Sequence, residues 1–233
     1  SGDLSPYSAR VRLQIYAKGI TDIVLERPAS FGMPKFREDH PIGRIPVLDI
    51  DGDMMPESEV IAEYLEAIYP EPSMLGATPR ETARIRTLAR VGDIYILNNM
   101  FMLSAQSRAE TRNQGIVDLL GGQVVRNIKA LNRMIGTDGF AYGGRVTMAD
   151  CALVPALFMV DNVLPSVGVD NPIPANANVA AYWAAIQTNE HAARVLVELH
   201  RGLEERRELI RSGAFAKMMA AAAAAQAAAD AAG

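Results

Sequence analysis

The stretch Gly43-Arg44-Ile45-Pro46-Val47-Leu48, followed after an Asp51-Gly52 turn by Glu57-Ser58, decides the fold of this chain. A proline cannot donate a hydrogen bond to a strand ladder, so within an apolar run it normally marks an edge or a bulge. A cis Ile45–Pro46 bond would turn the amide and carbonyl of Val47 toward a ligand, and cis prolines are uncommon, specific features. The alternative is a strand that simply begins at Pro46.

The residues on either side of this stretch predict a small α/β domain over residues 1–69. Helical spacing runs from Tyr7 to Lys18, and Gly19 ends that helix. Thr21–Leu25 is short and β-branched, which predicts a strand. Gly32–Pro41 is polar and bounded by proline, which predicts a loop with at most a short helix.

A hairpin and a helix complete the predicted domain. An Asp-Gly pair separates Ile45–Ile50 from Asp53–Met55. This pair favours a tight hairpin because the turn needs positive φ. Glu57–Ile68 carries its apolar residues on one face, which predicts an amphipathic helix that packs on the sheet.

A change in composition follows the α/β domain. Residues 70–79 are rich in proline and lack periodicity, which predicts a linker. Residues 80–213 predict an all-helical domain, in which Thr147-x-x-Asp150 forms a capping box. The alanine-rich tail, 214–233, predicts a fraying helix or disorder. The predicted helices run from Arg80 to about Ala109, from Thr111 to about Ile135, from Met148 to about Val163 and from Val179 to about Leu209.

Composition excludes several classes of function. The apolar content of 49% is that of an ordinary globular protein, and the net charge of −4 argues against nucleic-acid binding. No span is long and apolar enough for a membrane, and no basic-then-apolar leader is present, so we expect a cytoplasmic protein. The 3 histidines are scattered and Cys151 lies in an apolar run, so we expect no metal site.

Several polar residues could form a site for a small thiol peptide. Ser5 precedes the first helix, where the helix dipole favours an anion and lowers a thiol pKa, although it could serve only as a cap. Glu57 and Ser58 present a carboxylate, a hydroxyl and free amides at a second helix start, which suits an amino-acid-like ligand end, although Ser58 could be an ordinary helix-start residue. A second ligand carboxylate could pair with Arg44, His40 or Lys35, each of which could instead be a solvated surface residue.

A further set of residues could line a pocket for an apolar or aromatic acceptor. Four of its candidates recur at i, i+4, i+7 and i+11 and so share one helical face, which could also be a core face. The candidates are Tyr7, Met33, Tyr95, Asn99, Met102 and Gln106.

Taken together, the motifs resemble those of a glutathione transferase, in the family's order and over nearly the whole chain. The resemblance implies a thioredoxin-like N-terminal domain, an all-helical C-terminal domain, a homodimer, and glutathione bound beside a cis-proline. The motifs are Ser5-Pro6-Tyr7-Ser8-Ala9-Arg10-Val11-Arg12, Lys18-Gly19, His40-Pro41-x-Gly43-Arg44-Ile45-Pro46-Val47-Leu48, Glu57-Ser58-x-x-Ile61 and Thr147-x-x-Asp150.

The resemblance also implies roles for single residues. Val47 matches the position whose backbone pairs with the cysteinyl unit of glutathione, and Glu57 and Ser58 match the pair that holds its γ-glutamyl end. Ser5 matches the catalytic position that stabilises the thiolate in theta, zeta and tau relatives. Zeta relatives usually show Ser-Ser-Cys where this chain has Ser5-Pro6-Tyr7, which departs from the maleylacetoacetate isomerase pattern.

The expected function is therefore that of a glutathione S-transferase, with glutathione as co-substrate and no metal. Its thiol would attack a hydrophobic electrophile by conjugation, thiolytic ether cleavage or dehalogenation, in detoxification or aromatic catabolism. The alternatives are a glutathione-dependent isomerase of the maleylacetoacetate or maleylpyruvate type, and a non-catalytic ligand-binding or scaffold protein. The family has a central strand before the catalytic serine, so we expect about five or six residues to be absent ahead of Ser1.

Overall fold

The computed structural model describes residues 2–28, 30–31, 33–107, 109–214, 216–217, 220–221, 223–224 and 227, so much of the alanine-rich tail lies outside the described residues. Its elements in chain order are α1 (Pro6–Lys18), α2 (Pro34–Asp39), β1 (Val47–Ile50), β2 (Asp53–Pro56), α3 (Ser58–Ile68), α4 (Pro79–Arg90), the π-helix η1 (Val91–Leu97), α5 (Asn98–Ser104), η2 (Ala109–Thr111), α6 (Gln114–Leu131), α7 (Met148–Asn162), η3 (Leu164–Val167), α8 (Ala177–Ile186) and α9 (Glu190–Arg211).

The predicted hairpin is confirmed. β1 and β2 pair antiparallel, with Ile50 opposite Asp53 at the turn. Asp51 and Gly52 both have positive φ, 53° and 93°, as the two-residue turn requires. The amide of Gly52 donates to the Asp49 carboxylate at 2.7 Å, which holds the turn closed.

The predicted strand Thr21–Leu25 is wrong: these residues are irregular, and β1 and β2 form the sheet of the described residues. Val24 is 83% exposed. A β-branched run becomes a strand only where a neighbouring strand supplies ladder partners, and no described segment pairs with this one. The short helix expected within Gly32–Pro41 is present as α2.

The second part of the chain is helical, as predicted, but two of the predicted helices are divided. The run from Arg80 contains the π-helix η1 between α4 and α5. The run from Val179 ends at Ile186 and begins again at Glu190 as α9, because the Asn189 side chain accepts from the amides of His191 and Ala192, both at 3.1 Å.

The capping box at the start of α7 is confirmed, and it reaches beyond the helix. The Asp150 carboxylate accepts from the amide and the hydroxyl of Thr147, both at 2.8 Å. It also accepts from the amide of Ala141 at 2.8 Å and from the Tyr182 hydroxyl at 3.1 Å. One buried carboxylate thus joins α7, the preceding loop and α8. Burial raises its pKa.

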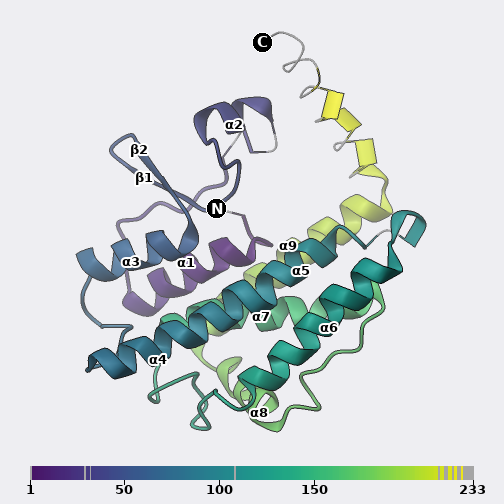
Figure 1. The fold of residues 1–233 in the computed structure, drawn as a ribbon. Coiled ribbons are helices and arrows are strands. Elements are labelled where there is room, and N and C mark those ends of the chain that lie inside the picture. The colour runs from purple at the N-terminus through teal and green to yellow at the C-terminus, as the bar shows by residue number, and fades with distance from the viewer. Residues whose placement is uncertain are drawn as a thin grey trace.

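Helix α1 joins the α/β region to the helical region. It packs on α7 and α9 on one side and on α3 on the other (Figure 1). Three of its basic side chains are buried and form ion pairs with other elements: Arg10 with Glu59, Arg12 with Glu198 and Lys18 with Glu66, each at 2.7 Å.

Candidate active site

Two adjoining cavities lie where α1, the hairpin and α5 meet. The first, here called the hairpin cavity, has a volume of about 240 Å³ and is lined by Pro46, Glu57, Ser58 and Asp93. The second, the α1 cavity, measures about 440 Å³ and is lined by Ser5, Phe31, Phe101 and Arg206. The residues that line both are Tyr7, Arg44 and Ile45.

Ser5 occupies the N-cap of α1 and lines the α1 cavity. Its extended backbone (φ −71°, ψ 113°) lets Oγ accept from the amide of Ser8 at 3.2 Å. That bond uses one lone pair and leaves the O–H of Ser5 as a donor. A sulfur anion in this cavity would therefore meet a hydroxyl donor at the positive end of a 13-residue helix.

The proline that begins the hairpin lies in the wall of the hairpin cavity, and the Ile45–Pro46 bond is cis. Ladder bonds of an antiparallel pair alternate, and the pair Ile50–Asp53 closes a two-residue turn. Counting back along the register, Val47 lies at a non-hydrogen-bonded position opposite Pro56. The amide and carbonyl of Val47 consequently point away from β2, at the outer edge of the hairpin.

The start of α3 contributes the polar end of the hairpin cavity. Glu57, the residue before α3, has φ 71° and ψ 108°, a conformation that L residues rarely adopt and that concentrates at functional sites. Ser58 is buried, and its Oγ accepts from Arg10 Nη1 at 3.4 Å. Its hydroxyl hydrogen remains available to a ligand.

Arg10 contacts two residues that line the hairpin cavity, Ser58 and Asp93. Sequence analysis did not identify Arg10 as a site residue. Its guanidinium, 2% exposed, pairs with Glu59 at 2.7 Å and with Asp93 at 3.1 Å. Asp93 lines the cavity and also pairs with Arg90 at 2.8 Å. The signals in the sequence were weak: an arginine between apolar helix residues, and a lone acid in the apolar run Val91–Leu97.

Tyr7 lies between the two cavities and lines both. Burial raises the pKa of its hydroxyl, and the nearby Asp93 carboxylate raises it further. Tyr7 therefore carries its proton at neutral pH and offers a second O–H donor beside Ser5.

The structure separates the three basic candidates for a ligand carboxylate. Arg44 lines both cavities, with its guanidinium 4.8 Å from the centre of the Phe101 ring. Lys35 is exposed and pairs with Asp39 at 2.8 Å, and His40 packs against Phe36 with ring centres 4.5 Å apart. Neither lies in the lining of either cavity.

Five of the predicted acceptor residues also lie outside both linings. Four of them belong to a neighbouring face of the same helical run, because the residues that line the cavities there include Ile94, Leu97, Phe101 and Ser104. Leu97, Phe101 and Ser104 line the α1 cavity instead. The five are Met33, Tyr95 and Met102, which are exposed, Asn99, which donates to the Tyr95 carbonyl, and Gln106, which accepts from the amide of Asn113.

The described residues include neither an exposed cysteine nor a cluster of metal-binding side chains. Burial raises the pKa of the Cys151 thiol well above its ordinary value, so it stays a thiol within the core. The described part of the chain holds no cluster of three or more histidine, cysteine, aspartate or glutamate residues that could bind a metal. None of the described helices has the length and apolar character to span a membrane.

Comparison with known proteins finds related sequences for both parts of the chain. Residues 2–73 match the glutathione S-transferase N-terminal domain and residues 114–185 its C-terminal domain. A maleylacetoacetate isomerase from Pseudomonas aeruginosa is 32% identical over 165 residues, which cover 67% of this chain and 78% of that protein. The chain belongs to the glutathione S-transferase family. A Pseudomonas putida glutathione S-transferase is 24% identical over 90% of this chain and 96% of its own.

Solved structures show the same fold for this glutathione S-transferase family member. A bacterial zeta-class maleyl pyruvate isomerase superposes with a TM-score of 0.67 at 24% identity, over 83% of this chain and 93% of its own. A Methylobacterium radiotolerans glutathione S-transferase bound to glutathione sulfonate gives 0.69 at 20% identity, over 84% and 92%. The expected fold, a thioredoxin-like domain followed by a helical domain, is confirmed.

Proposed function

We propose that this protein is an enzyme that binds glutathione in the hairpin cavity and activates its thiol at Ser5 for attack on an electrophile in the α1 cavity. The observation that carries the proposal is the shared wall of the two cavities, formed by Tyr7, Arg44 and Ile45 at the N-terminus of α1. A thiol peptide in one cavity and an acceptor in the other would meet there.

The hairpin cavity offers a partner for each polar group of glutathione. Glu57 and Asp93 supply carboxylates for the γ-glutamyl ammonium, while the Ser58 hydroxyl and the start of α3 suit the adjacent carboxylate. The outward-facing amide and carbonyl of Val47 suit the cysteinyl backbone, as an added strand would. The guanidinium of Arg44 suits the glycyl carboxylate.

The chemistry at Ser5 is stabilisation of a thiolate. The Ser5 O–H donates to the sulfur, and the helix N-terminus lowers the thiol pKa, so the proton passes to solvent before attack. The sulfur then forms a bond to the electrophilic carbon. A leaving group departs with its electron pair, or, at a double bond, the neighbouring carbon takes up a proton.

The test is Ser5→Ala, with Ser8→Ala as a matched control. Ser8 is 1% exposed in the same helical turn, and its Oγ has no hydrogen-bond partner among the described residues. With glutathione and an aryl halide, we expect Ser5→Ala to lower kcat/KM on the order of 100-fold, as loss of one donor to a developing anion does. Glutathione affinity should hold, and the pKa of bound glutathione, read from thiolate absorbance, should rise. Unchanged turnover and thiol pKa in Ser5→Ala would refute the role.

A second candidate is glutathione-dependent isomerisation, favoured by relatives named maleylacetoacetate isomerase in Pseudomonas aeruginosa and, at 29% identity, in Rhizobium meliloti. Here the thiolate would add to a cis double bond, the resulting single bond would rotate, and elimination would return the thiolate. Glutathione is then not consumed. Product formed from a maleyl diketo acid, measured against glutathione lost, separates the two reactions, and bound glutathione without turnover of any electrophile favours a ligand-binding protein.

We also propose that the protein works as a homodimer in the cytoplasm. The exposed apolar side chains of Tyr95 on η1 and Met102 on α5 lie outside both cavities, where a second copy could cover them. A chain with one buried cysteine that uses glutathione suits a reducing compartment. Sedimentation velocity at several concentrations tests the dimer.

A further inference from the structure

The hydroxyl of Tyr7 has no part in the reaction as proposed above, although it lies at the wall that the two cavities share. Tyr7 is in the first turn of α1, two residues after Ser5, and lines both cavities. Its ring packs against the apolar core of the helical region, which holds the side chain in place. Among the described residues, none forms a hydrogen bond with the Tyr7 hydroxyl.

This hydroxyl is a proton donor that the thiolate does not need. Burial and the Asp93 carboxylate raise its pKa, and they outweigh the opposite effect of Arg10 and Arg44. The sulfur already has two sources of stabilisation, the Ser5 O–H and the N-terminus of α1. The O–H of Tyr7 is therefore available to a second reacting atom, on the acceptor.

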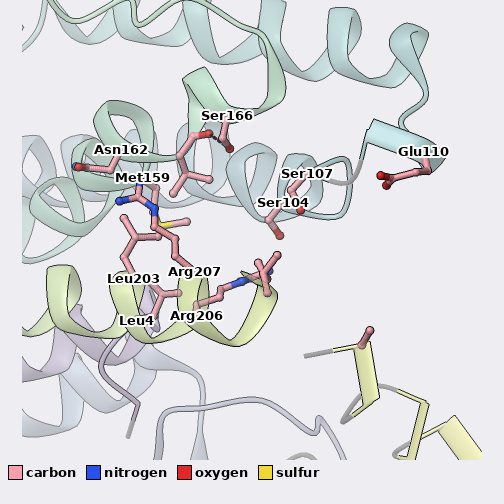
Figure 2. A pocket seen from close by; sticks show the side chains of 13 residues that line it. Leu4, Ser104, Ser107, Glu110, Met159, Asn162, Ser166, Leu203, Arg206 and Arg207 are labelled. Carbon is pink, nitrogen blue, oxygen red and sulfur yellow. Dashed lines mark hydrogen bonds between the residues drawn. The ribbon is translucent and has the colours of Figure 1, made fainter. Parts of the chain in front are cut away.

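A third cavity, here called the α9 cavity, provides space beyond the α1 cavity. It has a volume of about 650 Å³, and Leu4, Ser104 and Met159 are among the residues that line both. Its wall is formed by side chains of α5, α7 and α9, among them Ser104, Met159 and Leu203 (Figure 2). An acceptor whose reacting bond lies in the α1 cavity thus has room for a bulky group on each side of that bond. A halide as leaving group would not use this space, whereas an aryloxy group would.

We infer that the acceptor is an aryl ether and that Tyr7 is a catalytic residue, which donates its proton to the leaving oxygen. The inference rests on the proposed function for the thiolate and for the position of the reacting carbon beside Ser5. The sulfur forms a bond to this carbon, the carbon–oxygen bond breaks, and the oxygen keeps the electron pair. The oxygen takes the Tyr7 proton and leaves as a phenol, and the tyrosinate regains a proton from solvent. A phenolate is a more basic leaving group than chloride, so ether cleavage gains most from a positioned proton donor.

The test uses a series of α-aryloxy ketones and the corresponding α-chloro ketone, which present the same methylene carbon to the glutathione sulfur. In the ethers the leaving group is a phenol, and substituents on its ring vary its pKa. In the chloro ketone, chloride leaves without a proton. The ketone carbonyl is common to all of them, so a hydrogen bond to that carbonyl would affect ethers and chloride alike.

We expect Tyr7→Phe to lower kcat/KM for the unsubstituted aryl ether on the order of 100-fold, as loss of a positioned proton donor does. The loss should shrink as substituents make the phenol more acidic, because a less basic oxygen needs the proton less. For the chloro ketone, kcat/KM should stay close to that of the wild type. The pKa of bound glutathione should not change, which separates this role from that of Ser5.

Tyr142→Phe is the matched control. Tyr142 is also partly buried against the core of the helical region, and it lies outside the linings of all three cavities. This variant should keep the wild-type kcat/KM for the ethers and for the chloro ketone.

The inference is wrong if Tyr7→Phe slows the chloro ketone as much as the ethers, or if its effect does not depend on the pKa of the phenol. A higher pKa of bound glutathione in Tyr7→Phe would also overturn it, because the hydroxyl would then serve the sulfur. Turnover of the chloro ketone without cleavage of any ether would contradict the inference and leave the proposed function intact.

Calorimetric binding of the product phenols in the presence of glutathione tests the same hydroxyl without turnover. We expect Tyr7→Phe to weaken this binding and Tyr142→Phe to leave it unchanged. That result in a protein that turns over no electrophile would support a phenol site at Tyr7 and contradict the proposed function. Equal binding in the wild type and Tyr7→Phe would contradict the placement of the phenol oxygen at Tyr7.

Discussion

The α/β region and the helical region of this glutathione S-transferase family member are stabilised in different ways. In the helical region, α7 is buried along Met148–Val160 and lies within one large apolar core. The separate apolar cluster of the α/β region contains four buried residues, from α1 and α3. The region that carries the proposed glutathione site therefore depends for its stability on its attachment to the helical region. Its two-stranded sheet adds little to that stability.

The attachment is made by opposite faces of α1. Ala9 and Leu13 belong to the large core, whereas Val11 and Ile15 belong to the small cluster. The buried ion pairs of α1 add polar links on both sides, to α3 and to α9. We expect substitutions in the helical core to unfold the whole protein, and substitutions of these links to loosen the α/β region first.

The largest effect is expected from Asp150→Ala, which should destabilise the helical region. Loss of the carboxylate leaves four buried groups without an acceptor: the amides of Thr147 and Ala141 and the hydroxyls of Thr147 and Tyr182. At about 1–3 kcal/mol for each buried unsatisfied group, the free energy of unfolding should fall by roughly 4 kcal/mol. Urea denaturation followed by circular dichroism measures it.

The control for this substitution is Asp118→Ala. Asp118 lies exposed on α6, where it accepts from the side chain of Gln114 at 2.7 Å. Its loss should change stability by no more than about 0.5 kcal/mol. A similar small change for Asp150→Ala would show that the capping network does not stabilise the helical core.

The next effect in size is expected from Arg10→Met, which tests the link between α1 and α3. The substitution leaves Glu59 and Asp93 without their buried partner, and removing one member of such a pair is destabilising by about 3 kcal/mol. Hydrogen exchange should quicken in α1 and α3 before it quickens in α7. Glutathione affinity should fall as well, because Asp93 and Ser58 line the hairpin cavity.

The matched control for Arg10 is Arg86→Met. Arg86 pairs with Glu63 at 3.0 Å and also links α3 to another helix, but both side chains are nearly half exposed. Exposed ion pairs contribute about 0–1 kcal/mol to stability. Hydrogen exchange in α1, α3 and α7 should therefore stay close to that of the wild type. If Arg10→Met quickens exchange in α7 as much as in α3, then the two regions unfold as one unit.

The sequence predicted features whose causes are local. Asp51-Gly52 predicts its turn because the positive φ values belong to those two residues, and Thr147 with Asp150 predicts a cap because the partners lie three residues apart. Ser5 was predicted as a helix-start residue for the same reason, and it caps α1.

The sequence could not predict features that depend on distant partners. Thr21–Leu25 has strand composition, but a strand needs a neighbour, which no local pattern supplies. The run from Asp93 to Ser104 has apolar residues on more than one face, so the pattern does not identify the face that lines the cavities. Arg206 lines the α1 cavity because α9 packs on α1 and α7, far along the chain from Ser5.

The smallest effect is expected from Tyr16→Phe, which removes a half-exposed link between α1 and α9. The Tyr16 hydroxyl donates to Glu198 at 2.8 Å; burial, this bond and the charge of Glu198 raise its pKa to about 12. The unfolded pKa is about 10, so the stabilisation is fully present below about pH 10 and is lost as the pH rises toward about 12. Solvent screening keeps this stabilisation below about 1 kcal/mol.

Urea unfolding from about pH 9 to about pH 11 should show a steeper loss of stability in the wild type than in Tyr16→Phe. Parallel curves would mean that this hydroxyl does not hold the two regions together, and that the ion pair of Arg12 with Glu198 is the link between α1 and α9.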